Sequence, residues 1–257
     1  MRTDLRDKAV LVTGASSGIG RATAIAYGTE RARVAITYHT DEAGAQETAR
    51  LVAEAGGTPL ILPYDLADER SAHSVAGRVA KEWGGIDVLI GNAVSWGEAI
   101  PRPGRPVPLF EDVPPEQWRE VLRTSIDAAF HLLQAALPAM RTRPWGRIVL
   151  IGAGLADTGK PGAGAYGAGK SALYGLVRSL AWELGPEGIL INMVVPGQTL
   201  TETVRAHVPS DFLVEKGKQL PSGRMSDPQD VANAVLFLGS AANGNSNGET
   251  VRVTGGS

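Results

Sequence analysis

A tyrosine and a lysine stand four residues apart in Tyr166-Gly-Ala-Gly-Lys170. The surrounding residues have helical spacing, and on a helix this separation places both side chains on one face. A phenol is a poor acid or base near neutrality because its ordinary pKa is about 10. A neighbouring ammonium favours the phenolate and lowers that pKa. The pair therefore predicts proton transfer by Tyr166, with Lys170 adjusting its pKa.

A second chemical feature is the glycine-rich turn near the start of the chain. It reads Gly14-Ala15-Ser16-Ser17-Gly18-Ile19-Gly20 and lies between an apolar run and a helical pattern. Glycines permit positive φ angles and let backbone N–H groups approach a ligand closely. The following helix N-terminus carries a partial positive charge. In this context the turn predicts a site for the pyrophosphate of a dinucleotide.

The elements that must position these residues alternate along the chain. Apolar, β-branched runs predict strands, and the segments between them have helical periodicity, which together indicate a parallel sheet covered on both faces. The expected strands are Ala9–Thr13, Val34–Tyr38, Pro59–Leu62, Val88–Ile90, Ile148–Ile151, Leu190–Val195 and Thr250–Val253. The expected helices cover roughly 18–30, 41–55, 68–83, 115–141, 165–184 and 228–240. We expect an α/β, Rossmann-type doubly wound sheet of about seven strands in a single domain, residues 1–257.

Three segments interrupt the alternation. Residues 96–115 are rich in proline and predict a loop, and residues 152–169 hold seven glycines. Residues 199–223 have weak periodicity and predict a substrate lid. We expect these three segments to determine which substrate is bound.

Composition excludes several classes of protein. A net charge of −2 argues against nucleic-acid binding, and the absence of cysteine excludes disulfides and thiolate metal sites. The four histidines lack metal-ligand spacing, so no metal is expected. No apolar run is long enough to span a membrane, and the N-terminus lacks a signal-peptide pattern. These features predict a cytoplasmic protein.

The chain resembles the short-chain dehydrogenase/reductase family, and in particular its 3-oxoacyl and carbonyl reductases. The resemblance covers about residues 5 to 256 and rests on the glycine turn, the Tyr166–Lys170 pair and three shorter matches. Asp65-Leu66 matches the acidic position beside the adenine ring, and Asn92-Ala93 matches the core of an Asn-Asn-Ala-Gly motif.

The third short match is Pro196-Gly197, followed by Thr199 and Thr201, which corresponds to the segment around the nicotinamide. The resemblance implies that these residues bind the cofactor, that Lys170 also anchors its ribose, and that the protein forms a homodimer or homotetramer.

The end of the second expected strand bears on which dinucleotide is used. A carboxylate there would hold the ribose hydroxyls of NAD and repel a 2′-phosphate. The strand ends instead at Tyr38-His39-Thr40, and Thr37, His39, Thr40 and Ser17 could all bond a phosphate. We therefore favour NADP(H) over NAD(H), although no arginine stands in the usual clamp positions and Tyr38 and His39 could be ordinary surface residues.

Two positions of the family's catalytic set are replaced. The expected serine, 13 residues before the tyrosine, is Ala153, which cannot bond a substrate oxygen. The expected asparagine, seven residues after Trp118, is Ser125, which could still hold a water for a proton relay through Lys170. Ser95 and Thr158 are candidates for the missing substrate donor.

Two functions remain open. In the first, the protein reduces a ketone, or oxidises a secondary alcohol, with NADP(H). In the second, it binds the dinucleotide but has a non-redox role, such as cyclisation or dehydration, or acts as a sensor or scaffold. Retention of both Tyr166 and Lys170 favours the first, because a protein that only binds the cofactor does not need the pair.

Overall fold

Seven parallel strands form one sheet in the computed structural model, which describes residues 2–95 and 107–257. The strand order is β3-β2-β1-β4-β5-β6-β7, with every neighbouring pair parallel. The strands are β1 (Ala9–Val12), β2 (Arg33–Tyr38), β3 (Thr58–Pro63), β4 (Val88–Gly91), β5 (Gly146–Ile151), β6 (Ile189–Pro196) and β7 (Thr250–Val253). This arrangement confirms the predicted doubly wound sheet.

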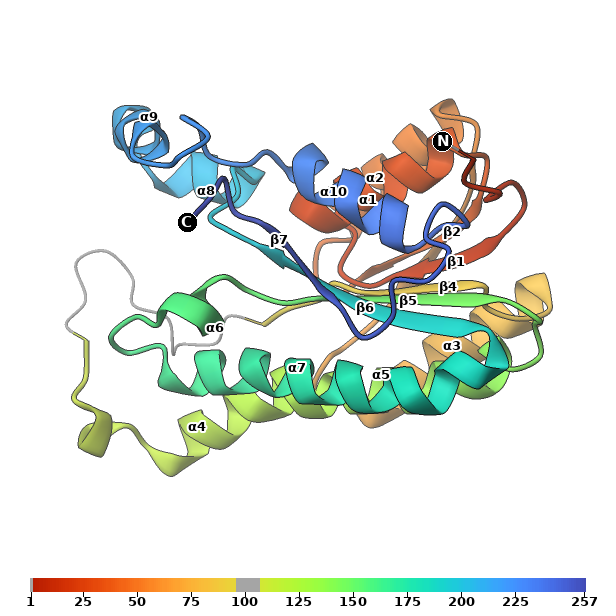
Figure 1. Ribbon diagram of the computed structural model, residues 1–257, viewed down its shortest axis with the longest axis horizontal. Coiled ribbons are helices and arrows are strands. Elements are labelled where there is room, and N and C mark those ends of the chain that lie inside the picture. The colour runs from red at the N-terminus through yellow and green to blue at the C-terminus, as the bar shows by residue number, and fades with distance from the viewer. Residues whose placement is uncertain (1, 96–106) are drawn as a thin grey trace.

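Helices cover both faces of the sheet (Figure 1). One layer contains α1 (Gly18–Thr29), α2 (Glu42–Glu54) and α10 (Pro228–Leu238). The opposite layer contains α3 (Glu69–Trp83), α4 (Pro115–Leu122), α5 (Ala128–Met140) and α7 (Gly164–Leu184). Shorter elements are η1 (Phe110–Asp112), α6 (Leu155–Thr158), η3 (Gly185–Glu187), α8 (Glu202–His207) and α9 (Ser210–Lys218).

The core consists of two apolar layers, one on each face of the sheet. Successive strand residues point to opposite faces, so Val10 and Val12 pack toward α1, α2 and α10, whereas Leu11 packs toward α3, α5 and α7. The central strands β1, β4 and β5 are buried along almost their whole length. Burial on both faces explains why these strands are apolar throughout rather than alternating.

Local signals in the sequence set several helix boundaries. Asp41 caps α2 by accepting a hydrogen bond from the Gly44 N–H at 2.9 Å, and Asp68 accepts one from the Arg70 N–H at 3.0 Å at the start of α3. The start of α10 combines Asp227 and Asp230 in a reciprocal capping box. These caps agree with the predicted starts to within a residue or two.

Three segments contain more structure than the sequence predicts. The expected helix 115–141 consists of α4, a π-helical turn at Arg123–Asp127 (the π turn) and α5. The glycine-rich segment contains α6 and the start of α7, and the lid segment 199–223 contains α8 and α9. Most of the predicted proline-rich loop, residues 96–115, lies outside the described residues, which omit 96–106.

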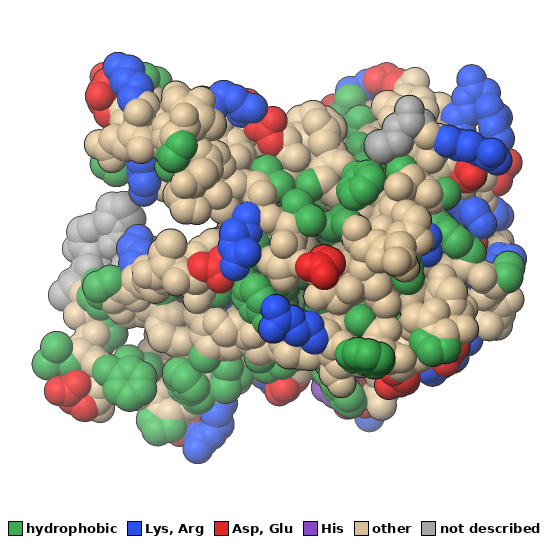
Figure 2. All heavy atoms as spheres, in the orientation of Figure 1, with side chains coloured by type: hydrophobic (Ala, Val, Ile, Leu, Met, Phe, Trp, Pro, Cys, Tyr) green, Lys and Arg blue, Asp and Glu red, His purple; other side chains and the backbone are tan. Residues whose placement is uncertain are grey.

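The carboxyl ends of the strands meet at one edge of the sheet. The strand order reverses between β1 and β4, and in such sheets ligands bind at the carboxyl edge beside this reversal. The glycine turn follows β1, and the segment Asn92-Ala93 follows β4. Figure 2 shows an indentation between the lid helices α8 and α9 and the body of the molecule.

Candidate active site

The glycine turn packs closely against neighbouring backbone because its glycines lack side chains. Gly14 has a φ of +62°, and a Cβ on it would lie 2.7 Å from the Ala93 Cα. A Cβ on Gly20 would lie 2.2 Å from the Gly14 carbonyl oxygen. The backbone therefore folds tightly against the end of β4, with the first N–H groups of α1 at its mouth. Such a turn fits the pyrophosphate of a dinucleotide.

Thr13 and Asn92 hold the turn in this shape. Asn92 donates from Nδ2 to the carbonyl oxygens of Thr13 and Gly14, both at 2.9 Å. The Thr13 hydroxyl accepts hydrogen bonds from the backbone N–H groups of Asn92 and Ala93, both at 3.0 Å. The Asn92 side chain therefore positions the glycine turn. Thr13, which precedes the first glycine, is a positioning residue that the sequence reasoning did not single out.

The end of β2 differs in part from the expectation for a phosphate site. Thr37 is fully buried, and its hydroxyl accepts a hydrogen bond from the Gly14 N–H at 3.0 Å, so it supports the turn rather than facing a phosphate. Partial desolvation and the neighbouring Glu42 carboxylate raise the pKa of Tyr38. His39 is largely exposed, and its Nε2 lies 3.8 Å from an oxygen of Asp65.

Asp65 and Leu66 follow β3 at the same edge. Asp65 accepts a hydrogen bond from the Ala67 N–H at 2.8 Å, and its own N–H donates to the Ser71 hydroxyl at 2.9 Å. Leu66 packs partly against the apolar core. These contacts fix the turn after β3 beside His39, at the far end of the site from Tyr166.

The segment after β6 reaches across to the glycine turn. The Gly197 N–H donates to the Val253 carbonyl oxygen at 2.9 Å, which ties Pro196-Gly197 to β7. The buried Thr199 donates from its hydroxyl to the Gly197 carbonyl oxygen at 3.1 Å. A Cβ on Gly18 would lie 3.1 Å from the methyl group of Thr201, so the structure brings Thr201 to the glycine turn.

Tyr166 and Lys170 lie on one face of α7 and are almost completely buried, with 2% and 6% of their surfaces exposed. Lys170 Nζ donates to the Ile151 carbonyl oxygen at 2.9 Å, at the end of β5, and lies 6.0 Å from the centroid of the Tyr166 ring. The predicted pair is therefore brought together at the carboxyl edge of the sheet.

The protonation states of the pair differ from the simple expectation. Burial raises the pKa of Tyr166, whereas the sequence argument expected the ammonium to lower it. The reason is that desolvation of the buried phenol dominates. Burial also lowers the pKa of Lys170 to about 8. At neutral pH the phenol is held in its protonated form, and the ammonium can release its proton close to neutrality.

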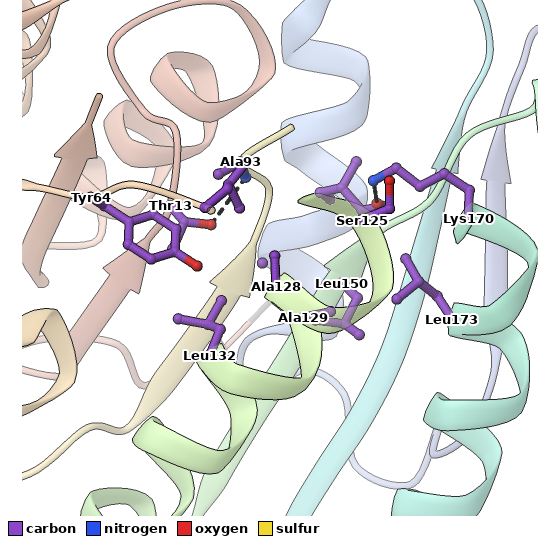
Figure 3. Close-up of a pocket in the computed structure, with 13 residues that line it drawn as sticks. Thr13, Tyr64, Ala93, Ser125, Ala128, Ala129, Leu132, Leu150, Lys170 and Leu173 are labelled. Atoms are coloured by element: carbon purple, nitrogen blue, oxygen red, sulfur yellow. Dashed lines mark hydrogen bonds between the residues drawn. The ribbon is translucent and has the colours of Figure 1, made fainter. Parts of the chain in front are cut away.

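Ser125 lies on the π turn and faces Lys170 (Figure 3). Its hydroxyl oxygen is buried and has no hydrogen-bond partner among the described residues. Ser125 and Lys170 line one small cavity together with Thr13 and Ala93. A Cβ on Gly169 would lie 2.8 Å from the Ser125 Cβ, so α7 packs directly on the π turn. The cavity thus extends from Lys170 to Thr13, which precedes the glycine turn.

The candidate substrate residues lie in different surroundings. Ala153 is partly buried and packs in a small apolar cluster with Val121, Ala165 and Tyr166. Thr158 is exposed at the end of α6, and its hydroxyl donates to the Gly154 carbonyl oxygen at 3.3 Å. Ser95 follows β4 and is half-buried. Of the two alternative donors, Thr158 has its hydroxyl engaged within α6.

One contact at the glycine turn has no counterpart in the predictions. The carboxylate of Glu202, the first residue of α8, accepts a hydrogen bond from the Gly18 N–H at 2.9 Å. Arg21 Nη1 donates to the other oxygen of this carboxylate at 3.0 Å. The sequence holds only a weak signal for this contact, namely a cation after the turn and an anion after Thr201.

Two features are absent from residues 2–95 and 107–257. None of their helices combines the length and apolar character needed to cross a bilayer. Within the same ranges, no three or more His, Asp or Glu side chains are gathered in a way that could hold a metal ion.

Comparisons with known proteins agree with this geometry. A family model described as enoyl-(acyl carrier protein) reductase matches residues 14–257. The chain is 36% identical over 249 residues to the 3-oxoacyl-[acyl-carrier-protein] reductase FabG of Escherichia coli, covering 97% of this chain and 96% of the relative. It is 34% identical to acetoacetyl-CoA reductase of Rhizobium meliloti, covering 97% and 98% of the two chains.

Solved structures give the same result. A short chain dehydrogenase from Burkholderia cenocepacia in complex with NADP matches with a TM-score of 0.84 and 30% identity, covering 98% of each chain. A dehydrogenase/reductase from Sinorhizobium meliloti matches with a TM-score of 0.87 and 31% identity, covering 98% of this chain and 95% of the other.

Proposed function

Since the chain is an oxidoreductase that belongs to the short-chain dehydrogenase/reductase family, we propose that it interconverts a ketone and a secondary alcohol with NADP(H). One observation carries the proposal: a buried tyrosine and lysine meet at the carboxyl edge of the sheet, where a cavity extends from Lys170 to Thr13, the residue before the glycine turn. This edge is where the nicotinamide and the substrate of such an enzyme meet.

When bound, a reduced nicotinamide supplies the hydride for the substrate carbon. The phenol of Tyr166 donates a proton to the carbonyl oxygen, which completes the alcohol. The raised pKa of Tyr166 suits this direction, because it keeps the donor protonated at neutral pH. Lys170 then supplies a proton to replace the one that Tyr166 has donated, and its pKa of about 8 lies close to working pH.

Ser125 assists this proton transfer. Its buried hydroxyl faces the cavity that Lys170 also lines, and it can hold a water there. Such a water connects the ammonium to the outside, so that Lys170 regains its proton after each turnover. Ser125 takes the place of the larger asparagine of the family pattern.

The preference for NADP(H) rests on the end of β2. Tyr38 occupies the position where a carboxylate would repel a 2′-phosphate. The nearby Asp41 carboxylate is engaged as the cap of α2. His39 is exposed beside this position and can bond a phosphate. The NADP complex of the Burkholderia cenocepacia neighbour agrees with this preference.

The names of the relatives suggest the substrate and the assembly. Two of them are reductases of 3-oxoacyl thioesters by name, so acetoacetyl-CoA is the first substrate to test. We further propose a cytoplasmic homodimer or homotetramer. Phe130 on α5 and Trp182 on α7 support an assembly, because both are exposed large apolar side chains.

The test is turnover of NADPH, and separately of NADH, with acetoacetyl-CoA and a panel of simple ketones. Wild type should oxidise NADPH with a higher kcat/KM than NADH. Tyr166→Phe should retain cofactor binding and lose 10²–10⁴-fold in kcat, because the variant lacks the proton donor. His39→Ala should weaken NADPH binding and leave NADH binding unchanged.

Tight cofactor binding without turnover on any ketone would contradict the reductase and favour a non-redox or sensing role. This alternative rests on Ala153, which stands at the position where the sequence resemblance predicts the family's serine. Equal kcat/KM values for NADPH and NADH would contradict only the cofactor preference.

A further inference from the structure

A carboxylate of the lid segment contacts the glycine turn. The Glu202 carboxylate accepts a hydrogen bond from the Gly18 N–H at 2.9 Å on one oxygen and from Arg21 Nη1 at 3.0 Å on the other. Gly18 is the first residue of α1, the helix whose N-terminus forms part of the glycine turn. A negatively charged oxygen of the protein therefore lies at the N-terminus where a pyrophosphate oxygen is expected to bind.

We propose that Glu202 is a latch that mimics the cofactor's pyrophosphate and that the dinucleotide must displace it. A helix N-terminus attracts one anion, and two anions at the same N–H repel each other. Binding of the dinucleotide therefore requires the carboxylate to leave Gly18. This inference rests on the proposed dinucleotide site and adds to it a residue that sets cofactor affinity.

Arg21 gives the latch a fixed anchor. Its Nε donates to the Thr48 hydroxyl at 3.0 Å, and its Nη2 donates to the Ser16 carbonyl oxygen. These bonds tie the guanidinium to α2 and to the glycine turn, independently of Glu202. The movable partner is thus the carboxylate on the lid, whose side chain is about half exposed.

Release of the latch affects the lid because Glu202 begins α8. Thr201 is the N-cap of this helix, and its hydroxyl accepts a hydrogen bond from the Val204 N–H at 3.3 Å. The Thr201 methyl group also lies against Gly18. A carboxylate that leaves Gly18 therefore releases the first turn of α8 from α1. Cofactor affinity and lid position are coupled through this residue.

The variants that test the latch are Glu202→Gln, which removes the charge, and Glu202→Ala, which also removes the hydrogen bonds. A matched control is Glu215→Gln, which removes an exposed carboxylate from α9 in the same lid. The readouts are the Kd for NADPH and NADH by nicotinamide fluorescence and the Tm of the cofactor-free chain.

We expect both Glu202 variants to bind the dinucleotide about tenfold more tightly than wild type, because the competing anion is gone. Their cofactor-free Tm should fall by about 2 °C, since the latch stabilises only the empty chain. The control should change neither quantity. A simple loss of stability would not raise the affinity, so the two opposite shifts together identify a latch.

Two results would overturn the inference in distinguishable ways. If wild type binds and turns over the dinucleotide while both Glu202 variants keep its Kd, the latch alone is wrong. If neither wild type nor the variants bind NADPH or NADH, the proposed function and the latch fall together.

Discussion

The glycine turn after β1 and the segment after β5 lie at the same edge of the sheet, yet they depend on different parts of the chain. At the turn, backbone groups and the absence of side chains make the site, with Thr13 and Asn92 fixing its shape. Near the end of β5, the proposed chemistry depends on side chains, and there the sequence predicts that Ala153 and Ser125 replace two residues of the family's catalytic set.

The difference between the glycine turn and the segment after β5 indicates which of the two regions can change without loss of the fold. A Cβ on Gly20 would meet a backbone oxygen at 2.2 Å, so the cofactor half tolerates almost no substitution there. Ala153 and Ser125 lie beside a cavity and a small apolar cluster, where a lost hydroxyl or amide leaves the backbone in place. Substrate chemistry can therefore diverge over a constant cofactor site.

The largest expected effect comes from adding a methyl group to the glycine turn. Gly20→Ala should weaken dinucleotide binding about a thousandfold, or about 4 kcal/mol, because the new methyl group overlaps the Gly14 carbonyl oxygen and the Asn92 amide. Titration calorimetry with NADPH measures this loss. The matched control is Gly77→Ala on α3, where a Cβ meets no atom within 4 Å. An unchanged Kd in Gly20→Ala would contradict the assignment of the turn.

The next effect concerns the buried lysine in the catalytic half. Burial lowers the pKa of Lys170 from 10.5 to about 8, so below pH 8 the folded chain bears the full penalty of the buried charge. Between pH 8 and 10.5 the unfolded chain binds more protons than the folded one, and stability rises with pH. Relative to Lys170→Met, wild type should gain about 3 kcal/mol across this window.

Urea unfolding of both proteins at several pH values measures this difference. The free energies of unfolding of wild type and Lys170→Met should converge or cross as pH rises. Wild type gains stability when Lys170 loses its proton, whereas the variant has no group that titrates at this position. Parallel curves between pH 8 and 10.5 would show that Lys170 is not held in a desolvated site.

A smaller effect is expected at Ala153, where the sequence predicts that the family's serine is replaced. Ala153→Ser should raise kcat on simple ketones about tenfold, since one donor to a substrate oxygen contributes up to 10²–10³ in rate. Ala53→Ser on the exposed face of α2 is the control for the added hydroxyl. No gain in Ala153→Ser would mean that another group, with Ser95 the first candidate, already supplies the donor.

The smallest effect is expected at the π turn. Ser125→Ala should lower kcat about threefold to tenfold and leave the Kd of NADPH unchanged, because it removes one polar partner of a water rather than a reacting group. Stopped-flow measurement of the hydride-transfer step locates the loss. A large change in Kd would assign Ser125 to cofactor binding instead.

Much of this fold could be predicted from sequence because its signals are local. Strand β7 and the start of α4 lie where the apolar run and Pro115 place them, and the spacing of Tyr166 and Lys170 fixed their common face. The π turn could not be predicted, since the periodicity of residues 115–141 is continuous. In the folded chain, α7 packs directly against Ser125 of this turn.

Properties set by the tertiary structure also escaped the sequence. Thr37 carries a hydroxyl that could bind a phosphate, but it is buried under the turn and accepts a hydrogen bond from the Gly14 N–H. The pKa of Tyr166 depends on desolvation, which no spacing reveals. The contact between Gly18 and Glu202 joins residues 184 positions apart. Such pairings require the folded chain.

Isotope transfer tests the central claim most directly, namely that the Tyr166 half and the glycine-turn half act together in hydride transfer. Wild type is incubated with acetoacetyl-CoA and NADPH that carries deuterium at the transferred position of the nicotinamide, and the product alcohol is analysed by mass spectrometry. Our account predicts one deuterium on the carbinol carbon, formed much more slowly by Tyr166→Phe. A product without deuterium, or an equal rate for the variant, would contradict it.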